Sequence, residues 1–266
     1  MQKHLRYIQA FWNNFMRHIP LLTNLISRNL KKRYRRSVLG YVWCVLNPLL
    51  VMLIMNFVFS NMFKNNIQNF PVYLFVGRMI FSFITDSTSG VMTTFINNGA
   101  LMRKTRIPYY IFPMAQFATS VVNFLFTLVA FAIVLVGTQT PITIHIIAFP
   151  AVVLQFVLFS FGLGLLLSQA NTFVRDVHYL YSVFTTAWMY LTPLFYPLES
   201  LPAFAQQVIS AFNPAYAFIQ QGRQIFLYNQ WPAGDLMLTG YIWAIGAMLL
   251  GGFAYWKCRD KLILYV

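Results

Sequence analysis

The stretch that decides the fold is residues 28–63, which read RNLKKRYRRSVLGYVWCVLNPLLVMLIMNFVFSNMF. Six of its first nine residues carry a positive charge, and from Leu39 onward it is almost wholly apolar. Positive residues that flank a membrane-spanning helix are retained on the cytoplasmic side. We therefore expect residues 1–36 to be cytoplasmic and the helix after Pro48 to be the first outward crossing.

The composition is that of an integral membrane protein. Of the 266 residues, 59% are hydrophobic and only 9% are charged, whereas soluble domains average about 25% charged residues. A membrane-spanning helix needs about 20 predominantly apolar residues. Six segments are candidates, with approximate bounds 48–63, 71–97, 113–136, 144–170, 179–196 and 236–256.

The net charge of +14 is concentrated on one side of this topology. With six crossings and both ends inside, sixteen of the nineteen Lys and Arg residues are cytoplasmic, and the exceptions are Lys64, Arg78 and Arg223. The anionic lipids of the inner leaflet attract such residues. Topology and lipid contact therefore account for the charge, and we do not expect nucleic acid as a partner.

The chain is predicted to form one all-α membrane domain over residues 1–266. Residues 1–36 indicate two amphipathic interface helices separated by Pro20, suited either to anchoring or to docking a cytoplasmic partner. Residues 37–256 form the six-span core, and residues 257–266 form a cytoplasmic tail. Residues 197–235 are too polar to span, so we expect two short helices in an outer re-entrant hairpin. Their Trp and Tyr residues are equally typical of interface anchors.

The second and third predicted spans each carry a polar stripe at helical spacing. The stripes consist of Ser82, Thr85, Asp86, Ser89, Thr93 and Asn97, and of Gln116, Thr119, Ser120, Asn123 and Thr127. An Asp or Arg in mid-helix costs about 2.5–3.5 kcal/mol on the insertion scale, so these stripes must face protein or water. Asp86 is then either buried and hydrogen-bonded between helices or part of a hydrated passage, and Arg78 is expected to snorkel toward the outer surface.

The motifs of common catalytic sites are missing from the sequence. None of the thirteen glycines is followed by lysine, so the nucleotide-binding P-loop is absent. The two cysteines, Cys44 and Cys258, have no His or Cys at ligand spacing, and a disulfide is not expected in a reducing cytoplasm. We therefore expect no catalytic residue, no metal and no cofactor on this chain, which would not be an enzyme by itself.

The pattern SxLGxxWxxLxP over residues 37–48 resembles the membrane subunits of the ABC-2 exporters that carry O-antigen, capsule or wall teichoic acid polymers out of bacteria. Residues 97–108 resemble the loop that carries the family's cytoplasmic coupling helix, residues 171–177 its second cytoplasmic loop, and Asn213-Pro214 followed by Arg223 its outer hairpin.

The resemblance implies a homodimer in the bacterial inner membrane, with both termini cytoplasmic and a lipid-linked polysaccharide as substrate. Two copies of a separately encoded ATPase would bind ATP and Mg. Two rival hypotheses stay open: an ABC-2 exporter of a small drug or lipid, and a membrane transferase acting on lipid-linked sugars.

The resemblance also implies two groups of site residues. At the substrate entrance and passage, cations would attract a pyrophosphate and aromatic rings would pack on sugars; the candidates are Lys31, Lys32, Arg33, Tyr34, Arg35, Arg36, Tyr41, Trp43, Ser82, Asp86 and Ser89. An interfacial aromatic belt explains Tyr41 and Trp43 equally well. The expected ATPase-coupling residues are Asn98, Leu101, Arg103, Lys104, Arg106, Arg175 and Asp176.

Overall fold

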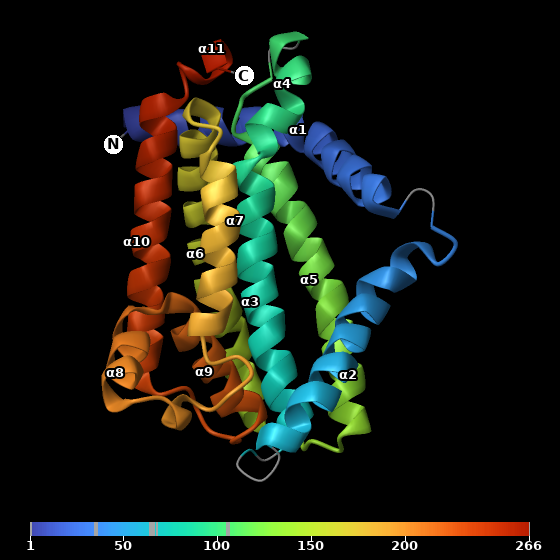
Figure 1. Cartoon of the computed structure of the whole chain (residues 1–266). Helices are drawn as coiled ribbons and strands as arrows, with labels where there is room; N and C mark the ends of the chain where they lie inside the picture. Colours follow the sequence, from blue (N-terminus) through green and yellow to red (C-terminus); the bar gives the residue numbers. More distant parts are fainter. Residues whose placement is uncertain (1, 35–36, 64–66, 68, 105–106, 266) are drawn as a thin grey trace.

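The computed structural model describes residues 2–34, 37–63, 67, 69–104 and 107–265, and all regular structure within these ranges is helical. Six long helices run along one bundle (Figure 1). They are α2 (Trp43–Phe63), α3 (Phe70–Met92), α5 (Ile111–Gly137), α6 (Phe149–Phe173), α7 (Val177–Leu191) and α10 (Gly234–Cys258).

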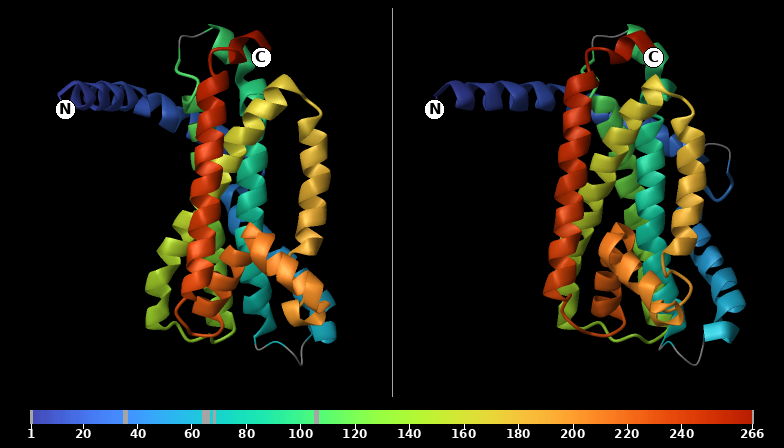
Figure 2. Two further views of the ribbon diagram at one scale, coloured as in Figure 1. Left: turned by 90° about the vertical axis from the view of Figure 1, so that its left-hand side faces the viewer. Right: turned by 60° about the vertical axis from the view of Figure 1, so that its left-hand side comes forward.

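The remaining helices gather at the two ends of the bundle. One end carries both termini and the helices α1 (Gln2–Tyr34), α4 (Thr94–Lys104) and α11 (Leu262–Tyr265) (Figure 1). The opposite end carries α8 (Ala203–Phe212) and α9 (Pro214–Phe226). The N-terminal part of α1 projects sideways, away from the bundle (Figure 2).

Among the described helices, four are long and apolar enough to cross a membrane. They lie at Gly40–Phe59, Ile111–Gly137, Ile144–Phe173 and Gly234–Cys258. The other two helices of the bundle do not meet these requirements of length and apolar character, for different reasons. The polar residues of α3, which include Arg78 and Asp86, reduce its apolar character, and α7 has only 15 residues, fewer than the roughly 20 that a membrane-spanning helix needs.

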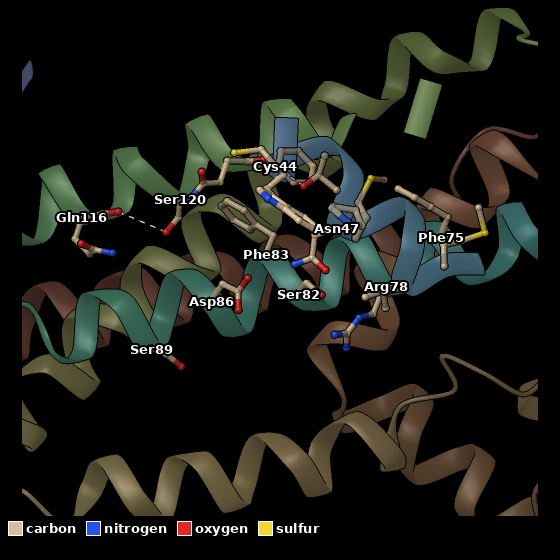
Figure 3. Close-up of a pocket in the computed structure, with 18 residues that line it drawn as sticks. Cys44, Asn47, Phe75, Arg78, Ser82, Phe83, Asp86, Ser89, Gln116 and Ser120 are labelled. Atoms are coloured by element: carbon tan, nitrogen blue, oxygen red, sulfur yellow. Dashed lines mark hydrogen bonds between the residues drawn. The ribbon is translucent and has the colours of Figure 1, made fainter. Parts of the chain in front are cut away.

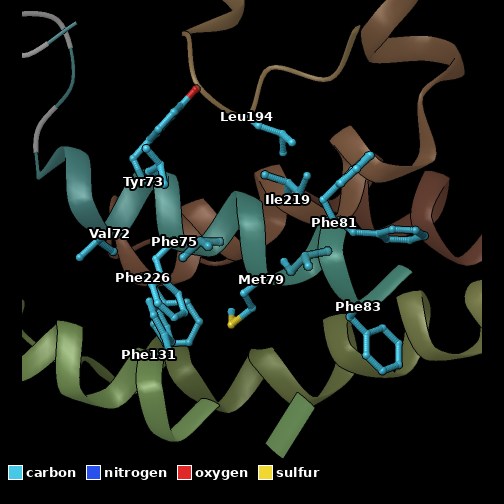
Figure 4. Close-up of a cluster of buried hydrophobic side chains, with 14 of the residues drawn as sticks. Val72, Tyr73, Phe75, Met79, Phe81, Phe83, Phe131, Leu194, Ile219 and Phe226 are labelled. Atoms are coloured by element: carbon cyan, nitrogen blue, oxygen red, sulfur yellow. The ribbon is translucent and has the colours of Figure 1, made fainter. Parts of the chain in front are cut away.

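The core is built around α3, which packs against α5, α6 and α9. Its aromatic side chains interlock with those of its neighbours (Figure 4). The ring of Phe75 lies 5.3 Å from that of Phe131 on α5, which lies 4.8 Å, edge to face, from Phe226 on α9. Aromatic pairs in this geometry add about 0.5–1.5 kcal/mol each beyond area burial. They hold α9 inside the bundle.

The helices α6 and α10 approach each other most closely at glycines. A Cβ atom on Gly162 would lie 2.4 Å from the backbone of Ala247, and one on Gly251 would lie 2.0 Å from the carbonyl oxygen of Gly162. Small residues permit such close backbone packing between membrane helices. Gly162 and Gly251 therefore allow the close packing of α6 against α10.

Several predicted boundaries are wrong, and the fifth predicted span ends at Leu191 rather than at residue 196. The chain forms a single helix α1 through Pro20, rather than two helices, because a proline costs a helix one hydrogen bond and can be accommodated within it. Likewise, α2 begins at Trp43 and contains Pro48. The second predicted span ends at Met92 rather than at residue 97, because the helix is interrupted at Thr93, where φ is −90° and ψ is 0°.

Candidate functional site

Parts of the polar stripes on α3 and α5 face one cavity, which α2 covers on one side (Figure 3). The stripe residues Thr85, Thr93, Asn97 and Thr119 are not among its lining residues. We call this cavity of about 360 Å³ the polar groove. Its polar and charged lining residues are Asn47, Arg78, Ser82, Asp86, Ser89, Gln116, Ser120, Asn123 and Thr127. Amide, hydroxyl and charged groups on helices of a membrane protein are expected only where they meet protein or water. The groove is therefore either filled with water or covered by protein.

Two opposite charges lie on the α3 wall of this groove. Arg78 and Asp86 lie eight residues apart on α3, and both line the groove. The guanidinium of Arg78 also contacts the sulfur of Met189 on α7 at 3.5 Å. Within a single chain Asp86 is exposed and lines the groove. Arg78 lines the groove instead of reaching the outer surface.

The wall formed by α2 combines apolar and polar groups. Trp43, Cys44 and Asn47 line the groove, and Trp43 is 38% exposed. Tyr41 is exposed but is not among the lining residues, and its ring stacks 6.4 Å from that of Phe126 on α5. Of the predicted passage residues, Trp43, Ser82, Asp86 and Ser89 therefore share the groove, and Tyr41 does not.

The predicted basic entrance is described only in part. Lys31 and Lys32 are exposed at the C-terminal end of α1. Arg33 and Tyr34 continue that helix, and nothing is described of their side chains. Arg35 and Arg36 lie outside the described residues. The entrance role of this cluster stays a prediction.

The predicted coupling residues lie at the end of the bundle that carries both termini. Arg103 and Lys104 are exposed in the last turn of α4, and Leu101 is half-buried. Arg175 and Asp176 are exposed in the turn between α6 and α7. Asn98 accepts a hydrogen bond from Arg28 of α1 at 2.7 Å. Arg106 lies outside the described residues.

At the other end, Arg223 of α9 is completely buried. Its guanidinium carbon lies 3.4 Å from the centre of the Tyr73 ring, and Nη2 donates to the carbonyl oxygen of Leu194 at 3.2 Å. The absence of a side chain at Gly77 makes room for it, since a Cβ there would lie 3.0 Å from Nη2. A desolvated cation over an aromatic face contributes about 2 kcal/mol or more. Arg223 therefore fastens α9 to α3 and to the segment after α7.

The Asn213-Pro214 pair makes a second attachment of α9. Asn213 Oδ1 accepts hydrogen bonds from the Trp188 indole at 2.9 Å and from the Tyr216 backbone at 3.3 Å, and its amide donates to the Thr192 hydroxyl at 2.9 Å. Pro214 occupies the first helical position, where its missing N–H has no consequence. The pair caps α9 and joins it to the end of α7.

Residues 20–227 match the family described as ABC-2 type transporter. The chain belongs to this family. The O-antigen export system permease protein RfbA of Myxococcus xanthus is 30% identical over 231 residues, which are 86% of this chain and 88% of that protein. Two proteins of Klebsiella pneumoniae with the same name are 28% identical over 229 residues and 29% identical over 208 residues, and they cover 85% and 78% of this ABC-2 chain and 88% and 80% of their own.

Sequence reasoning missed two contributors to these sites. Asn47 lines the groove, and it lies on a mostly apolar helix that also contains Asn56, Ser60 and Asn61. A polar residue in such a helix is itself a signal of a protein-facing position. The partner of Arg223 could not be foreseen, because Tyr73 lies 150 residues away in the sequence.

Proposed function

We propose that this chain is the permease subunit of an ATP-driven exporter of a lipid-linked polysaccharide of the O-antigen type. The observation that carries the proposal is the polar groove, in which two opposite charges on α3 and four amide or hydroxyl groups on α5 face one cavity. A helix that only anchors a protein in the membrane does not need such groups, because they are costly in lipid. The named relatives, which are O-antigen export permeases and align over most of their length, support the polysaccharide class.

In this proposal two copies of the chain form the passage. Asp86 is exposed in the middle of a helix of a membrane protein, and a charge in that position needs protein or water beside it. A second copy related by a two-fold axis would supply the missing wall, with the same surface on both subunits. The helices α3 and α7 would then also cross the membrane, which makes six spans, and α8 and α9 would form a re-entrant hairpin.

The end with both termini would face the cytoplasm, since it carries the exposed cations Lys31, Lys32, Arg103, Lys104 and Lys257. The basic end of α1 would attract the pyrophosphate of the substrate. Two separately encoded ATPase subunits, which hold ATP and Mg, would dock on α4 and on the turn with Arg175 and Asp176. Nucleotide-driven closure of the ATPases would rock the two subunits.

A deletion strain tests the substrate class. Loss of the gene should leave polymer-length, lipid-linked glycan inside the cell and none on the surface, and the wild-type gene should restore export. Unchanged surface glycan in the deletion strain would refute the proposal. Turnover of a lipid-linked sugar by the purified chain without any ATPase would indicate a transferase.

Charge reversal tests the docking surface. The double variant Arg103→Glu, Lys104→Glu should lose co-purification of the ATPase, because α4 would then present the wrong charge to its partner. The matched control is Lys257→Glu, Lys261→Glu, which reverses two exposed cations at the same end of the bundle. Equal ATPase recovery in both double variants would exclude α4 as the docking element.

A further inference from the structure

A short chain of polar contacts joins α4 to the polar groove by way of α1. Arg28 Nη2 donates to Asn98 Oδ1 on α4 at 2.7 Å. The next residue, Asn29, donates through Nδ2 to Gln116 Oε1 on α5 at 3.2 Å, and the same nitrogen lies 3.5 Å from the Thr119 hydroxyl. Gln116 lines the groove. Two adjacent residues of α1 thus touch the predicted coupling helix and the predicted passage.

Apolar packing holds α1 in the position that these contacts need. Leu25 is only 4% exposed and belongs to a buried cluster with Phe95 and Met102 of α4 and with Ile111 and Phe112 of α5. Residues four apart on a helix share a face. Leu25 therefore directs Asn29 toward α5, one turn further along α1.

The other side of Gln116 is confined by a glycine on α3. A Cβ atom on Gly90 would lie 2.7 Å from Gln116 Nε2 and 3.3 Å from its Cγ. The side chain of Gln116 thus occupies a space that exists only because residue 90 has no side chain. Its position in the groove is determined by Asn29 on one side and by Gly90 on the other.

We infer that Arg28 and Asn29 are positioning residues that transmit movement of α4 to Gln116 in the polar groove. This inference rests on the proposed function, in which the ATPase moves α4. Displacement of α4 pulls Arg28 through Asn98, and α1 carries Asn29 with it. Gln116 follows its hydrogen-bond partner, so the shape of the groove changes with the state of the ATPase.

The test uses the complete permease–ATPase complex in proteoliposomes. Transport per ATP should fall about fivefold or more in Asn29→Ala, the lower end of typical coupling between sites, while ATP hydrolysis continues. Arg28→Lys keeps a cationic donor and should retain more of the coupling than Arg28→Ala. The matched control is Asn24→Ala, since Asn24 is an exposed amide on the same helix.

A second readout does not depend on the polymer. Cys44 lines the groove, so its maleimide labelling rate, measured in a Cys258→Ser background, should change when ATP is added. Asn29→Ala should abolish that change and Asn24→Ala should preserve it. A wild-type complex without polymer transport would refute the proposed substrate, and the Cys44 labelling would still decide the inference about Arg28 and Asn29.

A glycine variant tests the same contact independently, in case the complex with Asn29→Ala does not assemble. Gly90→Ala should displace Gln116 and reproduce the loss of coupling, whereas Gly246→Ala should have no effect, because no atom lies within 4 Å of a Cβ at that position. Equal transport per ATP and equal ATP-dependent labelling in Gly90→Ala and Gly246→Ala would overturn the inference. The same equality between Asn29→Ala and Asn24→Ala would overturn it as well.

Discussion

Replacing Gly251 with alanine will force α10 away from α6. The added Cβ would lie 2.0 Å from the carbonyl oxygen of Gly162, whereas carbon–oxygen contacts are normally about 3.3 Å or longer. The two backbones must therefore separate by about 1 Å, and no side chain can rotate to avoid this. These helices share the most extensive contact of any described pair, so the separation also weakens dispersion contacts along their length.

The expected loss of stability is near 3 kcal/mol, the upper part of the range of about 1–3 kcal/mol for overpacking. For a chain of this length, about 2–4 °C per kcal/mol gives a fall of roughly 6–12 °C in the temperature at which half of the detergent-solubilised protein is lost. The assay is size-exclusion chromatography after a heating series.

The neighbouring glycine provides the control. A Cβ on Gly252 would meet no atom within 4 Å, so Gly252→Ala should be neutral or slightly stabilising, because alanine is the better helix former. Equal midpoints for Gly251→Ala and Gly252→Ala would refute the argument from the close contact with Gly162.

Three further predictions concern α9, α10 and the polar groove. Arg223→Met removes the buried cation from the ring of Tyr73 and should cost about 2 kcal/mol or more. Tyr73→Phe keeps the ring, loses the hydroxyl contacts to the carbonyl oxygens of Tyr196 and Pro193, and should cost about 1 kcal/mol. Similar melting midpoints for both variants would contradict this ranking. Gly240→Ala would place a Cβ 2.0 Å from Gln155 Oε1 and should cost about 1–3 kcal/mol, seen as earlier proteolysis, and unchanged proteolysis would argue against a tight contact there. Asp86→Leu should abolish surface glycan at normal expression while Asp86→Asn keeps part of it, and full export by Asp86→Leu would remove Asp86 from the passage.

Local patterns in the sequence were sufficient to predict that the chain is helical and that two of its helices carry polar stripes. The spacing of Ser82, Asp86 and Ser89 along one helix face is a property of the sequence alone, and the structure places all three in the polar groove. Prolines were poorer guides, because the effect of Pro20 or Pro48 depends on how the rest of the helix is held. The predicted helix break at Pro20 and the predicted helix start at Pro48 were therefore wrong.

The candidate site was foreseen only in its separate parts. The stripes on α3 and α5 predict a polar surface, but which helix covers it depends on packing between segments that are far apart in the chain. Asn47 and Gln116, which line the same groove, lie on different helices. No local pattern in the sequence predicts that Asn47 and Gln116 lie in the same groove.

By itself, the sequence determined that this is a membrane protein with a basic side and polar helix faces, because hydropathy, charge and helical period are local properties. Only the tertiary structure decided which polar faces meet. It brought Asn29 to Gln116 across 87 residues and Arg223 to Tyr73 across 150. Such contacts arise from the close packing of whole helices, in which a glycine at position 77 or 90 decides whether a distant side chain fits.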